Sequence, residues 1–240
     1  LERRASDSEA GGSVRTDPQF RPPRYLSTVD IHLMPGGYAD DRGEGDVRQG
    51  AVFDKAAALY HMGRNGGELN DVRGHTLVQH YFDRFPGMTP QRILDMGCGI
   101  GQMSVALKER FPDAEVWGID VGGPMVRYAH MRARRLGVEV NFAQRLAELS
   151  GFPDNYFDLV TSYIMHHELP GEITKKVIDE ARRVTRPGGV YYPIDFNSGG
   201  TKMPARMMYS RWYDHRWNNE VWSFEYHALN FTNEIGARGF

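Results

Sequence analysis

The sequence has little cysteine, no excess of basic charge and no long hydrophobic run, and each of these absences excludes a class of protein. Its one cysteine, Cys98, can form neither an internal disulfide nor a thiolate metal site, so we expect no bound metal. The formal net charge of -2 provides no basic surface for a phosphate backbone, so we expect no nucleic-acid partner. Without a membrane span or a secretory segment, the sequence predicts a cytoplasmic protein with no membrane partner.

From Gln91 onward, short apolar stretches alternate with segments of helical periodicity. The apolar stretches predict strands over residues 93–96, 116–119, 138–143, 157–163 and 190–196. Strands that alternate with helices favour a parallel sheet with helices on both faces. The predicted fold class is therefore α/β, with a doubly wound, mainly parallel sheet in a core domain over residues 89–196. The expected strand order is third, second, first, fourth, fifth.

The segments on either side of this core differ from it in composition. Residues 1–28 are polar and lack a hydrophobic period, so they predict a disordered tail. Residues 29–88 predict a helical lid, with one helix over 51–62 and another between Asn70 and Pro86. Residues 197–240 are rich in Trp, Tyr and Met, which predicts a segment that caps the substrate.

The last predicted strand contains Pro193, and proline is tolerated chiefly at the edge of a sheet. An exposed edge strand is a template for association. We therefore expect the fold to be completed by residues beyond Phe240. The alternative is that a second copy covers the edge in a homodimer.

The first predicted strand runs into the glycine-rich turn "ILDMGCGIGQ", residues 93–102. A dinucleotide fingerprint needs a third glycine where this chain has Gln102, and no Gly-Lys-Ser/Thr follows as in a phosphate-binding loop. An acidic residue, Asp120, ends the next strand, and Asp95 precedes the turn. Two carboxylates suit a cationic nucleoside without phosphates better than they suit a pyrophosphate.

In this combination the chain resembles the class I S-adenosylmethionine-dependent methyltransferases. The segments that carry the resemblance are "ILDMGCGIG", "VWGID", "FPDNYFDLVTSYIMHHEL" and "RRVTRPGGVYY", within about residues 91–196. The resemblance implies a Rossmann-like methyltransferase fold and a small-molecule methyltransferase with S-adenosylmethionine as cofactor. The expected activity is methyl transfer to a small apolar or aromatic acceptor, on oxygen, nitrogen or carbon.

The resemblance also implies which residues bind the cofactor. The glycines line its methionine and ribose portion, Asp95 lies near its amino group, Asp120 binds the ribose hydroxyls, and Met125 packs on the adenine. The expected cofactor-binding residues are Asp95, Gly97, Cys98, Gly99, Gly101, Gln102, Asp120, Met125, Leu146, Ala147 and Tyr163. The family commonly has an aspartate for adenine where this chain has Leu146. Adenine recognition then falls to the backbone of Leu146 and Ala147, or to Gln144 or Glu148.

The fourth predicted strand leads into two adjacent histidines. One of His166 and His167 is a candidate general base, and strand alternation predicts that at most one of them faces the pocket. The alternative is that both are structural. The candidate acceptor-binding residues are Met208, Trp212, Tyr38 and Tyr60. For Met208 and Trp212 the alternative is the seam of an amphipathic helix that packs on the sheet.

Two further functions stay open from the sequence. One is a catalytically silent module that binds S-adenosylmethionine, which the leucine at position 146 keeps possible. The other is a nicotinamide-dependent oxidoreductase, which the glycine spacing disfavours.

Overall fold

A computed structural model describes residues 12–60, 71–199 and 203–240 of the chain. Its centre is a six-stranded sheet in the order β1-β4-β3-β2-β5-β6, in which every neighbouring pair is parallel. The strands are β1 (Val14–Arg15), β2 (Arg92–Met96), β3 (Glu115–Asp120), β4 (Asn141–Gln144), β5 (Phe157–Tyr163) and β6 (Thr185–Ile194). The predicted fold class and the predicted order of the five core strands are confirmed.

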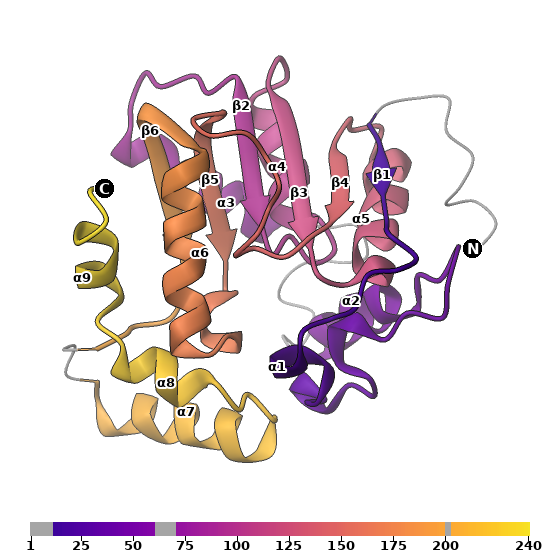
Figure 1. The fold of residues 1–240 in the computed structure, drawn as a ribbon, viewed down its shortest axis with the longest axis vertical. Coiled ribbons are helices and arrows are strands. Elements are labelled where there is room, and N and C mark those ends of the chain that lie inside the picture. Colours follow the sequence, from indigo (N-terminus) through magenta and orange to yellow (C-terminus); the bar gives the residue numbers. More distant parts are fainter. Residues whose placement is uncertain (1–11, 61–70, 200–202) are drawn as a thin grey trace.

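Helices cover both faces of the sheet (Figure 1). Helices α3, α4 and α5 pack on one face, and α6, α8 and α9 pack on the other. Their bounds are α3 (Val72–Arg84), α4 (Gln102–Arg110), α5 (Gly123–Leu136), α6 (Gly171–Val184), α8 (Ser223–Ala228) and α9 (Phe231–Gly236). The sheet is therefore the middle of three layers. Among the described residues, no helix is long and apolar enough to cross a membrane.

The last strand differs from its prediction at its start. It was expected to begin at residue 190, but β6 begins at Thr185, and its pairing shifts from Phe157↔Thr185 to Leu159↔Val190. This irregularity absorbs the extra residues while the strand continues. Pro193 lies in β6 at the edge of the sheet, as the proline rule predicts.

The N-terminal segment contradicts the expected disorder from residue 12 onward. Val14 and Arg15 pair with Phe142 and Ala143 of β4, and the Phe142 amide donates to the Ser13 carbonyl at 2.7 Å. Further along, the short helix α1 (Arg24–Ser27) buries Leu26. A two-residue strand has no hydrophobic period to reveal it, and its stability comes from the sheet edge that receives it.

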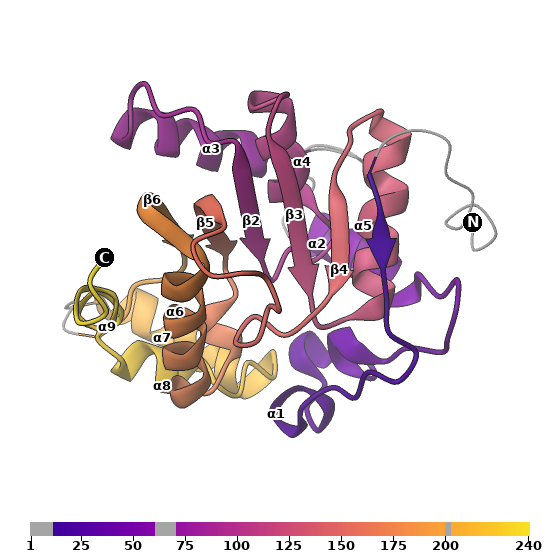
Figure 2. The same cartoon turned by 45° about the horizontal axis from the view of Figure 1, so that its top comes forward.

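The rest of the N-terminal segment lies at the carboxyl ends of the strands, together with α7 (Ala205–Trp217) (Figure 2). It contains the short 3₁₀ turns η2 (Ile31–Leu33) and η3 (Gly37–Ala39) and the helix α2 (Arg48–Tyr60), which packs on α5. The lid over residues 29–88 stays a prediction for its first part, whereas α3 belongs to the layer on the sheet and packs on α4. Asn70, the expected start of that helix, lies outside the described residues.

Candidate active site

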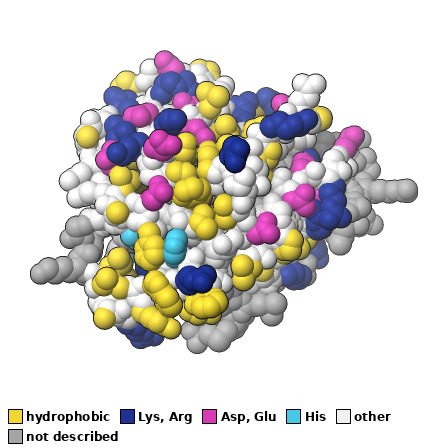
Figure 3. All heavy atoms as spheres, turned by 60° about the horizontal axis from the view of Figure 1, so that its bottom comes forward, with side chains coloured by type: hydrophobic (Ala, Val, Ile, Leu, Met, Phe, Trp, Pro, Cys, Tyr) yellow, Lys and Arg dark blue, Asp and Glu magenta, His cyan; other side chains and the backbone are white. Residues whose placement is uncertain are grey.

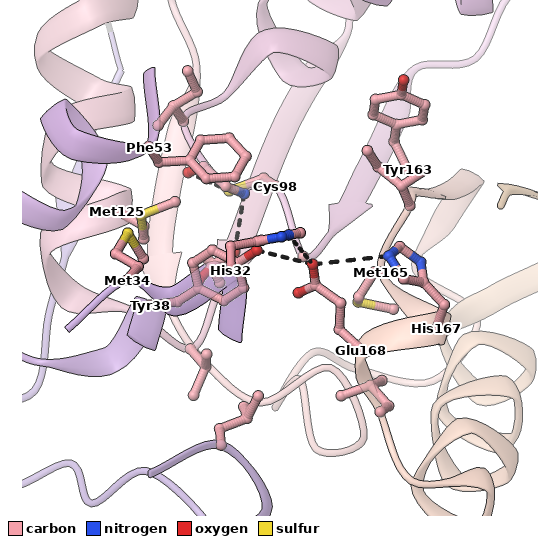
Figure 4. Close-up of a pocket in the computed structure, with 18 of the residues that line it drawn as sticks. His32, Met34, Tyr38, Phe53, Cys98, Met125, Tyr163, Met165, His167 and Glu168 are labelled. Carbon is pink, nitrogen blue, oxygen red and sulfur yellow. Dashed lines mark hydrogen bonds and ion pairs between the residues drawn. The ribbon is translucent and has the colours of Figure 1, made fainter. Parts of the chain in front are cut away.

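A cavity of about 700 Å³ opens at the carboxyl ends of β2, β3, β4 and β5. Ligands bind at this place in doubly wound sheets because the strand order reverses there. In Figure 4 the cavity separates His32, Met34, Tyr38 and Phe53 of the N-terminal segment from Met165, His167 and Glu168, which follow β5. Residues of α7 and the following turn also line it. The cavity therefore combines the sheet, the N-terminal segment and the C-terminal segment.

The glycine turn connects β2 to α4 along the floor of this cavity. Gly97, Gly99 and Gly101 all have positive φ, a region that residues with a Cβ adopt at a cost. The amides of Gly97 and Cys98 donate to the Ile119 carbonyl, which ties the turn to β3. A Cβ on Gly99 would meet only Met125 Cε, at 3.8 Å, so this glycine leaves space on the cavity side.

Gly101 differs from the other two glycines. A Cβ there would come within 2.9 Å of the Phe142 ring and 3.1 Å of Ala129, and the residue is the N-cap of α4. It does not line the cavity. The expected cofactor contact of Gly101 is thus not seen in the geometry, and its role is to let α4 lie close to the sheet.

Asp120 at the end of β3 faces the cavity and organises the turn. Its Oδ2 accepts from the Gly99 amide and its Oδ1 from the Gly122 amide, both at 2.9 Å. Burial raises the pKa of this carboxyl to about 6, although the two amides act in the opposite direction. A carboxylate oxygen has lone pairs for more than one donor, so Asp120 retains capacity for a hydroxyl in the cavity.

Asp95, the third residue of the turn motif, is fully buried below the glycines. Ser104 Oγ donates to its Oδ2 at 2.6 Å, whereas its Oδ1 is buried without a hydrogen-bond partner in the described structure. Burial raises the pKa of Asp95 to about 7. A buried carboxylate oxygen without a donor is costly, so the site is suited to a ligand that brings a cation or a donor to this atom.

The residues that follow β4 form the side of the cavity where adenine is expected. Leu146 and Ala147 line it, as expected, and so does Glu148, which accepts a hydrogen bond from Tyr25. The Gln144 side chain instead donates to the Val121 carbonyl and does not line the cavity. Of the alternatives for adenine, Gln144 is therefore not available, because its amide is used within the fold.

The other predicted cofactor residues also line the cavity: Gly97, Cys98, Gln102, Met125 and Tyr163. Met125 belongs at the same time to a small core cluster with Val47, Ile100 and Tyr128. Met125 is thus a core residue that also forms part of the cavity wall, and its contact with adenine stays a prediction.

The two histidines lie in the one-turn 3₁₀ helix η4 (His166–Glu168), since β5 ends at Tyr163. Strand alternation therefore does not orient them, although they do point in different directions. His166 is buried behind the cavity, with its Nε2 2.8 Å from the Tyr191 hydroxyl, and burial lowers its pKa to about 4. His167 lines the cavity, and its Nδ1 lies 2.8 Å from Asp195 Oδ1.

Asp195 determines the state of His167. Burial disfavours the imidazolium, but the charges of Asp195 and Glu168 outweigh it and raise the pKa of His167 above its ordinary value. Asp195 is itself held by the amides of His166 and Phe196, both at 2.7 Å. A carboxylate on Nδ1 orients the ring and leaves Nε2 toward the cavity, which is the arrangement of a general base.

Glu168 joins the two sides of the cavity. Its Oε1 accepts from Tyr38 Oη at 2.8 Å and lies 3.1 Å from His32 Nε2 and 3.9 Å from His167 Nε2 (Figure 4). Burial acts to lower the pKa of His32, but the carboxylates of Glu168 and Glu220 raise it to about 9. His32 also adopts a left-handed backbone conformation with φ 56°, a strained state that marks functional segments.

The expected acceptor residues have different outcomes. Tyr38 lines the cavity, but Met208 and Trp212 lie on the outer side of α7, with 57% and 44% of their surface exposed. They form neither a cavity wall nor a seam on the sheet; Arg211 and Asp214 of the same helix line the cavity instead. Tyr60 ends α2, and its side chain lies outside the described residues.

Comparison with known proteins defines the class of this fold and site. Residues 93–189 match the family model described as "Methyltransferase domain". The chain thus carries a class I S-adenosylmethionine-dependent methyltransferase domain, and the predicted resemblance is confirmed.

Several curated relatives act in quinone biosynthesis by name. The chain is similar to a demethylmenaquinone methyltransferase of Thermus thermophilus, with 38% identity over 45% of this chain and 48% of the relative. A ubiquinone/menaquinone biosynthesis C-methyltransferase of Cupriavidus metallidurans is 35% identical over 65% and 63%. A ubiquinone biosynthesis O-methyltransferase of Aeromonas salmonicida is 37% identical over 51% and 48%. The chain thus spans about half to two thirds of the length of these relatives.

Solved structures support the fold. The YcgJ protein of Bacillus subtilis superposes with a TM-score of 0.54, at 23% identity over 68% of each chain. A phosphoethanolamine N-methyltransferase of Haemonchus contortus superposes with a TM-score of 0.56, at 20% identity, over 83% of this chain and 43% of that one.

Proposed function

We propose that the protein transfers a methyl group from S-adenosylmethionine to a small apolar or aromatic acceptor. The observation that carries this proposal is the pair of carboxylates around the glycine turn, of which Asp120 holds the Gly99 amide and Asp95 has a buried oxygen without a partner among the described residues. Asp95 would meet the cofactor's ammonium, Asp120 its ribose, and the backbone of Leu146 and Ala147 its adenine. When bound, the cofactor supplies an electrophilic methyl group on a sulfonium.

The acceptor side of the proposal depends on His167 and the N-terminal segment. The lining of the cavity is mostly apolar and includes Met34, Phe53 and Met165. Such a wall suits an aromatic ring, and the curated relatives that methylate quinone precursors on carbon or oxygen by name favour this class of acceptor. In this proposal His167 Nε2 removes a proton from a hydroxyl on that ring, which raises the nucleophilicity of the acceptor.

Tyr38 and Glu168 form the second polar feature of the acceptor side. Because Glu168 accepts hydrogen bonds from Tyr38 and His32, the N-terminal segment is held over the cavity. A closed cavity excludes water from the methyl group and places the acceptor in line with it, and positioning of this kind is the main source of rate in such a reaction.

Titration with S-adenosylmethionine tests the cofactor part of the proposal. Asp120→Ala should weaken binding by about 1.5–3 kcal/mol, the scale for loss of charge-assisted hydrogen bonds. Asp158→Asn is a matched control. This carboxylate also holds two backbone amides, those of Gln91 and Arg92, but it does not line the cavity. The control should lose stability and keep cofactor affinity.

Turnover of a labelled methyl group with a panel of phenols tests the activity itself. Binding of the cofactor without turnover of any acceptor would favour the silent module. Binding of NAD in place of S-adenosylmethionine would refute the cofactor assignment.

A further inference from the structure

Helix α7 is packed on one narrow side only. Of its residues, all of which the structure describes, Asp214 alone is buried. Its outward residues are large and apolar or aromatic, and each is between 42% and 64% exposed: Met207, Met208, Tyr209, Trp212, Tyr213 and Trp217. A soluble protein rarely leaves such a contiguous group of large side chains in water without a use for it.

These side chains follow the periodicity of the helix. Met208 and Trp212 are four residues apart, as are Tyr209, Tyr213 and Trp217, so the two rows run side by side along one face. Arg206 and Arg216 are exposed on the same face, and Arg216 lies 5.0 Å from the centroid of the Trp217 ring. We call the following residues the outer face of α7: Arg206, Met208, Tyr209, Trp212, Tyr213, Arg216 and Trp217.

The charge of the outer face is of one sign. Asp214 is the one acidic residue of α7, and it is turned inward and paired with Arg211 at 2.9 Å. The outer face thus offers two cations, two Trp and two Tyr, and no carboxylate. Trp, Tyr and Arg are the residues that locate at the boundary between lipid headgroups and acyl chains, where a ring is buried and its polar atom stays wet.

A second copy of the chain fits this face less well than a lipid surface does. Two α7 helices that met by a two-fold axis would run parallel or antiparallel, and in either case the arginine at each end of one helix comes near an arginine of the other copy. No acidic residue on the face would compensate this repulsion. Anionic headgroups, in contrast, supply the missing negative charge.

The position of α7 ties this face to the site. The inner side of the helix carries Arg211 and Asp214, which line the cavity, while its outer side carries the aromatic rows. Figure 3 views the molecule from the strand ends and shows hydrophobic side chains gathered at the lower left, where α7 and α8 form the surface. A molecule that rests on this face therefore holds its cavity within one helix diameter of the headgroups.

We propose that the outer face of α7 docks the protein on the surface of an anionic membrane, from which an acceptor soluble in the bilayer reaches the cavity. This replaces the expectation of no membrane partner drawn from the sequence. The docking goes beyond the proposed methyl transfer, because it depends on none of the cofactor residues. The path of an acceptor from the bilayer to the cavity rests on the proposed function. The experiment below tests docking alone, so its outcome does not depend on that function.

Vesicle sedimentation with the full chain tests the docking, without cofactor or acceptor. The chain should sediment with vesicles of phosphatidylcholine and phosphatidylglycerol, and much less with phosphatidylcholine alone. Arg206→Gln with Arg216→Gln should weaken binding about thirtyfold, since each cation near an anionic surface contributes about fivefold. Added salt should weaken wild-type binding in the same direction. A blue shift of tryptophan emission on vesicle addition, lost in Trp212→Ser with Trp217→Ser, would place these two rings in the lipid.

Matched variants separate the outer face from general effects. Arg135→Gln with Lys176→Gln removes the same charge from α5 and α6, and Leu149→Ser removes an exposed apolar side chain, 69% exposed, from another surface. Both should bind anionic vesicles like the wild type. Equal losses in these controls, or no binding of the wild type, would overturn the proposal. So would a dimer in light scattering that the Trp212→Ser, Trp217→Ser variant dissociates, since a second copy would then occupy the face.

Discussion

Asp95→Asn should have opposite effects on the stability of the free protein and on its affinity for S-adenosylmethionine. In the free protein the carboxyl is fully buried and accepts a hydrogen bond from Ser104, and its other oxygen has no partner among the residues that the structure describes. Burial raises its pKa from 3.8 to about 7. The folded state therefore holds this proton more tightly than the unfolded state does.

The sign and size of the stability effect follow from that difference. The stabilising contribution of the protonated carboxyl is complete below about pH 4 and is lost as the pH rises through about 7. The full loss corresponds to about 4 kcal/mol. An asparagine keeps the acceptor for Ser104 and carries no charge, but its amide is left partly unpaired at a cost of about 1–3 kcal/mol. We therefore expect the variant to be about 1–3 kcal/mol more stable than the wild type above pH 7 and no more stable than it near pH 4.

Thermal unfolding across this pH range measures the first effect, and calorimetric titration with S-adenosylmethionine measures the second. Affinity should fall by about 1.5–3 kcal/mol, because the ammonium loses a charged partner. Asp158→Asn is the control with the opposite sign. The Arg186 guanidinium and two backbone amides lower the pKa of Asp158 against the effect of burial, so its removal should destabilise the protein at neutral pH. An Asp95→Asn protein that unfolds earlier than the wild type at every pH would refute the reasoning.

Three other substitutions test the site. His167→Ala should lower kcat by about 10²–10⁴-fold and remove an acidic limb from the pH–rate profile, which lies above the ordinary histidine pKa. His166→Ala should lower the melting temperature and leave the acidic limb of the pH–rate profile in place. Equal, small losses of kcat in both variants would support two structural histidines. Gly97→Ala should destabilise the fold by about 1–3 kcal/mol, because φ at this position is positive and the alanine Cβ would come within 2.5 Å of Met165 Sδ. An unchanged melting temperature would contradict this. Glu168→Gln should increase protease cleavage within the N-terminal segment and lower the pKa of His32 measured by NMR, and no change in either would show that Glu168 does not hold this segment.

The sheet and the glycine turn could be predicted from the sequence because their signals are local. An apolar strand, a positive-φ glycine and an acid at the next strand end each need only a few adjacent residues, and the structure places Gly99 and Asp120 in direct contact. The helix α7 could not be oriented in this way. A face of large apolar side chains predicts burial, whereas in α7 this face is exposed and Asp214 is the residue that faces inward.

The polar side of the cavity was missed for a different reason. Glu168 meets His32 across 136 positions of the chain, and Asp195 meets His167 across 28. A single sequence contains no signal for such pairs. The one local hint is Glu168 itself, an acidic residue that directly follows the two histidines.

The short strand β1 has a consequence for the timing of ligand exchange. It fixes the N-terminal segment to β4 at one end, while α2 fixes it to α5 at the other. The residues between, including η2 and η3, therefore form a strap with two anchored ends, and the conformational freedom that they gain on opening is limited by loop closure. Such a strap admits a ligand by a small bulging motion, and both anchors survive each cycle. We expect the residence time of a bound ligand to depend on the few contacts at the middle of the strap, those of His32 and Tyr38 with Glu168.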